Sequence, residues 1–237
     1  MLFVETDSHP IVLEREFKRL LKVPPRFEFT DQMAECAAWV RTWCATHSRP
    51  WLCARVVEPC EIREGHVHLE GVGLTSRELA RRFRHAQTAV IVGASAGIEA
   101  EAEAARRWAE DEPDRYYFLE TYASAIVEAL IAEAQARLCA WADASGRTLL
   151  PHYSPGYQGW TVGDQARVHG LLARGRDLPG PLEVMESGML RPKKSQLAVF
   201  AVAPSELVPP AEADLVPCRH CSLARCDFRR EPNLSLA

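Results

Sequence analysis

A run of four residues, Ser154-Pro155-Gly156-Tyr157, has the residue types and spacing of a site that holds a small ligand. Proline fixes φ and lacks an N–H, while glycine tolerates backbone angles that other residues avoid, so the run is not helical. Its backbone N–H and C=O groups are therefore expected to be open to a ligand. Tyr153, Tyr157 and Trp160 add ring faces. The chemistry predicted here is the binding of a small polar molecule that carries a ring.

Three cysteines near the C-terminus, Cys218-x-x-Cys221-x-x-x-x-Cys226, are spaced as ligands of a soft metal. Closely packed thiols bind such metals as thiolates, and the metal supplies folding energy that a short segment lacks. Structural zinc, an iron–sulfur centre and unliganded thiols all fit the spacing. The fourth ligand is open among five candidates: His220, Cys53, Cys60, a small molecule or a partner protein.

A third pattern, Gly93-Ala94-Ser95-Ala96-Gly97, matches the G-x-S-x-G turn that carries the nucleophile of α/β-hydrolases. A triad would then need an acid and a histidine later in the chain, and Asp143 with His152 or His169 are the candidates. Against this reading, no H-G-G-G-type oxyanion loop precedes Ser95. Serine hydrolysis therefore stands as the rival chemistry, from a different functional class.

The elements that position these residues follow from apolar periodicity. Residues 10–23 predict a helix with Ile11, Leu13 and Phe17 on its apolar face, and a second helix is expected after Thr30 as N-cap. Residues 51–73 alternate loosely and predict two strands joined through Pro59 and Gly65. Further helices are predicted at three places: from the Thr75-Ser76 cap, over 98–110, and over 116–142.

Two apolar runs rich in β-branched residues, 89–93 and 197–203, predict core strands. Lys193 and Lys194, just before the second run, are expected to lie in solvent. The predicted fold is α+β, with an N-terminal helical half packed on a twisted, mostly antiparallel sheet. The predicted organisation is a main domain over 1–202, a Pro-rich linker over 203–216, and a Cys-rich tail over 217–237.

Composition excludes several classes of function. The chain has 237 residues, 47% of them hydrophobic and 25% charged, which is typical of a folded globular protein. A formal net charge of −4 without a Lys/Arg tract argues against nucleic acid or an anionic membrane as partner. No apolar run approaches the roughly 20 residues of a membrane span, and the N-terminus lacks the pattern of a signal peptide. A cytoplasmic location is therefore expected.

The ligand run belongs to a longer pattern, because S-P-G-Y is followed by E-S-x-M-x-x-P-x-x-S at Glu186, Ser187, Met189, Pro192 and Ser195. This block resembles the activation domain of cobalamin-dependent methionine synthase, which binds S-adenosylmethionine. The resemblance extends over residues 12–200 and is specific in 151–195. It implies a stand-alone form of that domain, with the Cys-rich tail appended.

The resemblance also implies the ligand residues. In the family the Pro-Gly-Tyr run offers backbone groups to S-adenosylmethionine, and an arginine four residues before the glycine contacts the ligand. Here His152 stands in place of that arginine. Carboxylates of the long helix are further candidates for the ammonium or sulfonium. The implied binding residues are His152, Tyr153, Ser154, Pro155, Gly156, Tyr157, Glu128 and Glu133.

The implied function is reactivation of oxidised cobalamin on a partner, by one electron and the methyl group of S-adenosylmethionine. No cobalamin-binding module is visible, so the corrinoid is expected on a methionine synthase subunit, or on a corrinoid protein of another methyltransferase system. The electron would come from a flavodoxin or ferredoxin, and an iron–sulfur cluster in the tail could deliver it. The alternative from another functional class is a metal-dependent scaffold protein that binds no S-adenosylmethionine.

Overall fold

The computed structural model describes residues 1–210, 212–215 and 231. Its centre is a five-stranded sheet in which every neighbouring pair is antiparallel. Its strands, in spatial order, are β1 (Phe3–Glu5), β2 (Trp51–Val57), β6 (Thr88–Ser95), β10 (Ser195–Pro204) and β7 (Arg147–Leu149). The α+β class and the antiparallel sheet predicted from the sequence are therefore confirmed.

The two central strands are those that the apolar runs predicted. All eight residues of β6 are buried, because both faces of the sheet are covered. Side chains alternate between the faces, so Val90, Val92 and Ala94 belong to one core cluster while Ala89 and Ile91 belong to the other. β10 pairs with β6 along its length, from Ser195 opposite Ser95 to Val202 opposite Thr88.

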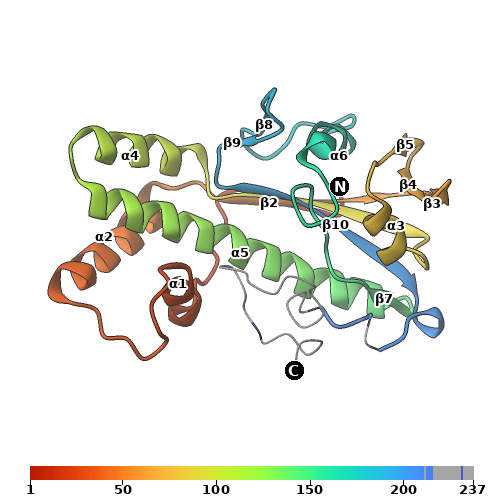
Figure 1. The fold of residues 1–237 in the computed structure, drawn as a ribbon, viewed down its shortest axis with the longest axis horizontal. Coiled ribbons are helices and arrows are strands. Elements are labelled where there is room, and N and C mark those ends of the chain that lie inside the picture. Colours follow the sequence, from red (N-terminus) through yellow and green to blue (C-terminus); the bar gives the residue numbers. More distant parts are fainter. Residues whose placement is uncertain (211, 216–230, 232–237) are drawn as a thin grey trace.

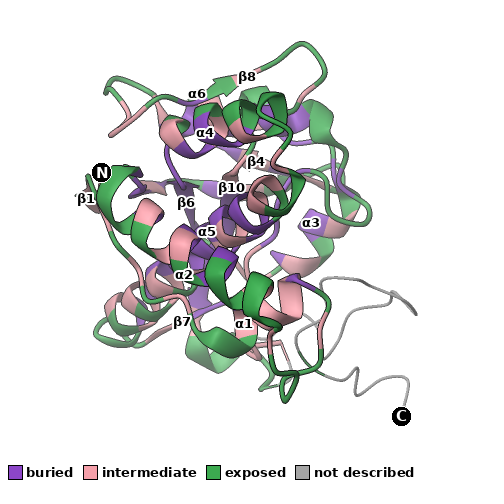
Figure 2. Ribbon diagram, turned by 90° about the vertical axis from the view of Figure 1, so that its left-hand side faces the viewer, coloured by how far each residue is buried: buried purple, intermediate pink, exposed green. Residues whose placement is uncertain are grey.

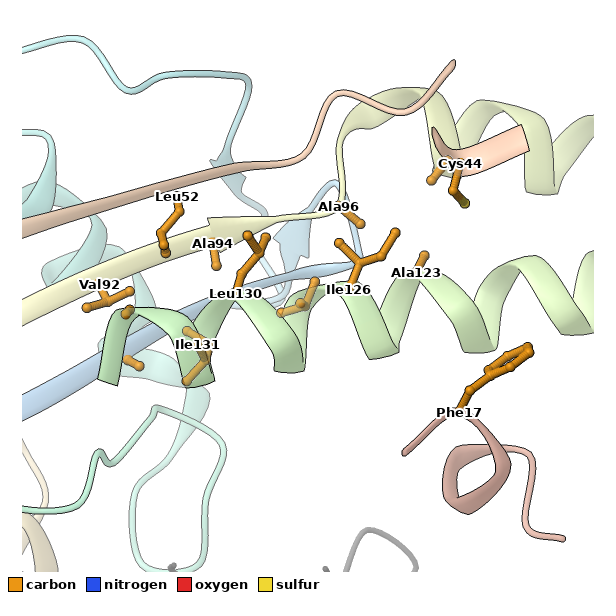
Figure 3. Close-up of a cluster of buried hydrophobic side chains, with 14 of the residues drawn as sticks. Phe17, Cys44, Leu52, Val92, Ala94, Ala96, Ala123, Ile126, Leu130 and Ile131 are labelled. Atoms are coloured by element: carbon orange, nitrogen blue, oxygen red, sulfur yellow. The ribbon is translucent and has the colours of Figure 1, made fainter. Parts of the chain in front are cut away.

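Helices cover one face of the sheet, with α5 lying along it (Figure 1). These helices are α1 (Glu14–Leu20), α2 (Asp31–His47), α4 (Ile98–Ala109) and α5 (Pro113–Asp143). Proline suits the first position of α5, where an N–H has no helical partner. Figure 3 shows Leu130 of α5 beside Ala94 of β6, and Ile126 of α5 beside Ala96, which follows that strand. Each Leu or Ile buried in this way contributes roughly 1.5–3 kcal/mol.

The opposite face carries smaller elements. They are α3 (Arg77–Arg82), α6 (Gln165–Leu172), the three-stranded sheet of β3 (Cys60–Arg63), β4 (His66–Leu69) and β5 (Val72–Gly73), and the hairpin of β8 (Glu183–Val184) and β9 (Leu190–Arg191). Short 3-10 turns span Val162–Asp164 and Ser205–Leu207. Figure 2 shows the buried strands between the two covers. Ser76 caps α3 by accepting the N–H of Leu79 at 3.0 Å, as the sequence predicted.

Two predicted elements were wrong in detail. The first helix begins at Glu14, and Ile11 is 84% exposed, so Ile11 is not on an apolar helix face. Residues 51–73 form β2 in the central sheet plus the separate sheet β3–β4–β5, rather than two strands. The N-cap at Thr30 is confirmed, since its Oγ1 accepts the N–H of Met33 at 3.4 Å.

The C-terminal part of the described chain leaves the sheet after Pro204. β10 thus continues past the boundary predicted at residue 202, and Ala203 is buried. Most of the predicted Cys-rich tail lies outside the described residues. Among the helices that the structure describes, none combines the length and the apolar character needed to cross a bilayer.

Candidate functional site

The predicted ligand run lies at the edge of the central sheet. After β7 the chain continues along β10, where Leu150 donates to the Ala201 carbonyl at 2.8 Å. Tyr153 and Val199 then exchange two backbone hydrogen bonds of 2.9 Å each. Residues 150–153 therefore line the part of β10 that extends beyond β7, and they deliver the run to a fixed place on the sheet.

Ser154-Pro155-Gly156-Tyr157 form a tight turn. The N–H of Tyr157 donates to the Ser154 carbonyl at 3.0 Å, and Gly156 has φ of +95°. Proline at the second position and a positive φ at the third are the signature of a type II turn. The Gly156 N–H is bonded to the Trp160 carbonyl at 2.8 Å. Both amides are thus used within the loop, which corrects the expectation that they are open to a ligand.

Side chains of this segment alternate between the two faces of the sheet. Tyr153 points to the α3 and α6 side, where its ring stacks on Trp160 with centroids 6.0 Å apart and Arg82 lies 4.5 Å above it. His152 points to the α5 side, where its ring lies 5.3 Å from that of Phe200. Ser154 falls on the same side as His152 by alternation. The two faces therefore have separate roles, one anchoring the loop and the other presenting polar groups.

Four side chains from two segments meet on the α5 side, and we name them the polar edge cluster: His152, Ser154, Tyr157 and Gln196. Gln196 Nε2 donates to Ser154 Oγ and to Tyr157 Oη, each at 3.2 Å. The Tyr157 hydroxyl also lies 3.3 Å from His152 Nε2. Tyr157 is 40% exposed, so part of its ring is open to solvent. The structure brings together three predicted residues here, and Gln196 is an addition that the sequence reading missed.

Lys194 extends this polar face towards α5. Its Nζ lies 3.0 Å from Ser124 Oγ and 3.2 Å from a carboxylate oxygen of Glu120. Lys193 Nζ lies 2.7 Å from the other oxygen of the same carboxylate. The expectation that both lysines lie in solvent is confirmed for Lys193, which is exposed, and was wrong for Lys194, which is half-buried against Glu120 of α5. Residue 194 directly precedes β10 and residue 196 lies on it, so by the alternation of an extended chain their side chains share the face that α5 covers.

The two predicted carboxylates of α5 contact other elements. Glu128 Oε2 is 2.5 Å from Arg19 Nη2, which ties α5 to α1. Glu133 lies 3.7 Å from Arg137, which also pairs with Glu5 of β1. Glu128 is thus engaged by α1, and Glu133 lies among contacts to β1. Their part in ligand binding stays a prediction.

A buried carboxylate holds the turn in place from behind. Asp164 is fully buried and accepts hydrogen bonds from Trp160 Nε1 at 2.8 Å, from Thr75 N at 2.6 Å and from Thr75 Oγ1 at 2.9 Å, and it pairs with Arg167. Burial raises the pKa of this carboxyl, but the hydrogen bonds outweigh burial and hold the pKa below its ordinary value. The sequence reading missed Asp164, because its pairing with Thr75 joins residues 89 apart in the chain.

Ser95 does not sit in a hydrolase triad. Its side chain is fully buried, its Oγ accepts from Ser195 Oγ at 2.8 Å, and it also accepts the Gly97 N–H at 3.2 Å. His169, a triad candidate, bonds to the Leu182 carbonyl at 3.1 Å. A nucleophile elbow exposes its serine at the top of an α/β-hydrolase sheet, whereas this serine is buried in an antiparallel one. The structure therefore contradicts serine hydrolysis at Ser95.

The predicted metal ligands Cys218, Cys221 and Cys226 lie outside the described residues, as does His220. Cys53 and Cys60 are buried, and burial raises the pKa of each thiol to about 12. A raised pKa disfavours the thiolate that a metal needs. Within 1–210, 212–215 and 231, no three His, Cys, Asp or Glu side chains are grouped so as to hold a metal ion.

Comparison with known proteins gives the fold. No protein-family model matches this chain, and no curated protein matches it in sequence. Among solved structures, the crystal structure of the MetH reactivation domain bound to AdoHcy is similar, with a TM-score of 0.64 and 12% sequence identity. The match covers 92% of this chain and 85% of that one. The chain therefore has the fold of the MetH reactivation domain.

Proposed function

We propose that this protein binds S-adenosylmethionine at the polar edge cluster and presents its methyl group to a corrinoid held by a partner protein. The observation that carries the proposal is the type II turn at Ser154–Tyr157, with His152, Tyr157 and Gln196 gathered beside it, on a fold shared with a reactivation domain. That structural neighbour was crystallised with AdoHcy, the demethylated form of the same molecule.

The chemistry of the donor set fits such a ligand. The half-exposed ring of Tyr157 provides a stacking face for an adenine. His152 and Lys194 offer donors for a carboxylate, with Lys194 the permanent cation. Glu120 supplies negative charge on the facing helix for an ammonium or sulfonium. We infer that the carboxylates of Glu128 and Glu133, further along α5, add to the negative electrostatic potential at this site.

The role of these residues is positional. When bound, S-adenosylmethionine would supply an activated methyl on sulfonium. A corrinoid cobalt reduced by one electron from a flavodoxin or ferredoxin would accept that methyl, and S-adenosylhomocysteine would be released. The turn orients the ligand, because Asp164 and the Val199 bridge fix it from two sides. No proton moves in a methyl transfer of this kind, so no general acid or base is required of the chain.

The partner that we propose is the corrinoid-binding part of a methionine synthase, and the runner-up is a corrinoid protein of another methyltransferase system. The tail cysteines Cys218, Cys221 and Cys226 are proposed to bind metal, either as an iron–sulfur cluster or as structural zinc.

Calorimetric titration with S-adenosylmethionine tests the proposal. Gly156→Val should weaken binding by about tenfold or more, because the new Cβ would lie 3.3 Å from Val162 Cγ1 at a φ of +95°, so the turn must shift. Tyr157→Ala should weaken it too, since the stacking face is lost. Gly146→Val is the matched control: it has φ of +65° and open space around it, away from the turn.

Three outcomes of the titration distinguish the possibilities. Binding by the wild type and by Gly146→Val, with loss in Gly156→Val, supports the site. A wild type that binds neither S-adenosylmethionine nor S-adenosylhomocysteine at millimolar concentration contradicts the function. Undiminished binding by Gly156→Val would show that the ligand binds somewhere other than the turn.

A further inference from the structure

Gln196 is the member of the polar edge cluster that belongs to the central sheet. It lies near the start of β10, where it is paired with Ala94 of β6, and its side chain is half-buried. The other three members of the cluster come from the segment beside β10. Because β6 holds this part of β10 in register, the backbone of Gln196 has a fixed place beside the ligand turn.

Two hydrogen bonds orient the side-chain amide of Gln196. Its Nε2 donates to Ser154 Oγ and to Tyr157 Oη, at 3.2 Å each, and these bonds use both N–H groups of the amide. The Tyr157 hydroxyl also lies 3.3 Å from His152 Nε2, so its proton has an acceptor there while its oxygen accepts from Gln196. The carbonyl oxygen, Oε1, is the branch of the amide that neither hydroxyl occupies.

Oε1 of Gln196 is open to a ligand. Within the part of the chain that the structure describes, no hydrogen bond reaches this oxygen. It is also not one of the buried side-chain atoms that lack a partner, so solvent reaches it. An acceptor that is already held in one orientation does not have to be reorganised when a donor arrives. The polar edge cluster therefore presents a preoriented acceptor beside the turn.

The position of this acceptor indicates which part of a ligand it contacts. The amide of Gln196 is bonded to the hydroxyl end of Tyr157, whose ring is 40% exposed and is proposed to stack on the adenine. A base stacked on that ring presents an edge, rather than a face, to a group at the end of the ring. The edge of adenine carries an exocyclic amine, which is a donor, whereas a 6-keto purine carries an acceptor at the same place.

We propose that Gln196 is a specificity-determining residue: its Oε1 accepts a hydrogen bond from the 6-amino group of the purine, so the site selects an adenine nucleoside over its 6-keto counterpart. This inference rests on the proposed function, because it requires the base to stack on Tyr157. A keto oxygen would place two acceptors against each other and leave both unpaired. Turning the amide over to offer Nε2 instead would break both of its present hydrogen bonds.

Calorimetric titration of the full chain with S-adenosylhomocysteine and S-inosylhomocysteine tests this inference. The two molecules differ only in the six-membered ring of the purine, where a keto oxygen takes the place of the amine. The wild type should bind the adenine compound about tenfold or more tightly, because a site that hydrogen-bonds one ligand group rejects an analogue that lacks it.

Variants link the preference to the amide. Gln196→Met keeps the length of the side chain and removes the acceptor, so the two affinities should come within about twofold of each other. If this change also loosens the turn, both ligands weaken together, and the ratio of their affinities still reports on the acceptor. Gln196→Glu keeps an acceptor at this place and should keep the preference. Gln87→Met, at an exposed position just before β6, is the matched control and should also keep it.

A preference that is present in the wild type and lost in Gln196→Met alone supports the inference. Equal binding of the two compounds by the wild type overturns it and leaves the proposed function standing, because the turn would still bind the nucleoside. An undiminished preference in Gln196→Met also overturns it, since another group must then read the purine. If the wild type binds neither compound, the proposed function is contradicted and this inference with it.

Discussion

At the scale of single residues, the buried carboxylate of Asp164 holds the turn in place from behind. Its carboxylate joins Thr75, Trp160 and Arg167, and so connects the segment before α3 to the loop that carries the turn. The turn itself was predictable, because Pro-Gly has known backbone preferences. Its anchor was not, since the pairing of Asp164 with Thr75 joins residues far apart in sequence.

Asp164→Asn should lower the free energy of unfolding by about 3 kcal/mol, because its single amide oxygen can accept from Thr75 and Trp160 only if the NH2 group faces the Arg167 guanidinium, and the ion pair is lost. Denaturation in urea would measure the loss. Asp177→Asn, at an exposed position, is the control and should change little. Equal stability of the wild type and Asp164→Asn would contradict the role given to this carboxylate.

The same residue predicts a pH dependence. Its folded pKa is held below the ordinary value, so its contribution to stability is present above the unfolded pKa of about 3.9 and is lost as pH falls through the folded pKa. The wild type should therefore lose stability below about pH 4 more steeply than Asp164→Asn does. Thermal denaturation between pH 2.5 and 7 tests this, and parallel curves for the two proteins would rule it out.

At the scale of elements, the position of α6 depends on one glycine of β6. A Cβ on Gly93 would lie 2.6 Å from Leu172 Cδ2 and 3.3 Å from Trp51 Cζ3. Leu172 is fully buried, so its side chain has no free space to turn into. The helix therefore packs closely on the sheet because residue 93 has no side chain.

Gly93→Ala should lower the free energy of unfolding by about 1–3 kcal/mol through overpacking. In a double-mutant cycle, Leu172→Val should recover part of that loss, because it removes a methylene at the point of contact. Chemical denaturation of the three variants gives the coupling energy. If the losses of the two single variants were strictly additive, the proposed contact would be contradicted, because α6 would then move away from residue 93 at no cost in stability.

The sequence predicted elements best where a strong pattern coincided with a specific end signal. Thr30 and Ser76 cap helices as expected, and the runs at 89–93 and 197–203 are central strands. Prediction failed around Ile11, where apolar spacing alone suggested helix one turn too early. It also failed over 51–73, because alternation shows that a segment is extended but not which strand it pairs with.

At the scale of the whole molecule, 12% identity and a TM-score of 0.64 to a reactivation domain show how little sequence the fold requires. A fold requires a pattern of buried apolar positions, and many sequences satisfy such a pattern. The identity of the proposed corrinoid partner would depend on the surfaces of two molecules, so the sequence of one chain could suggest it only through resemblance.

The Cys-rich tail, residues 217–237, makes a separate prediction. Elemental analysis after anaerobic purification should find iron or zinc in the wild type and none in the triple variant Cys218→Ser, Cys221→Ser, Cys226→Ser, because thiolates are the expected ligands. Cys139→Ser on α5 is the control and should retain the metal. Visible absorption together with iron indicates a cluster, and a colourless zinc protein indicates a structural site. Metal that persists in the triple variant would refute the assignment.

The segment of residues 150–153 covers an edge of β10 that would otherwise be open. Without it, the N–H of Val199 and the carbonyls of Val199 and Ala201 would be unpaired at an open sheet border, which is a template for strand addition by another copy. We therefore expect the segment that leads into the proposed ligand-binding turn to limit strand addition by another copy as well. Any change that loosens the loop should therefore reduce solubility and ligand affinity together.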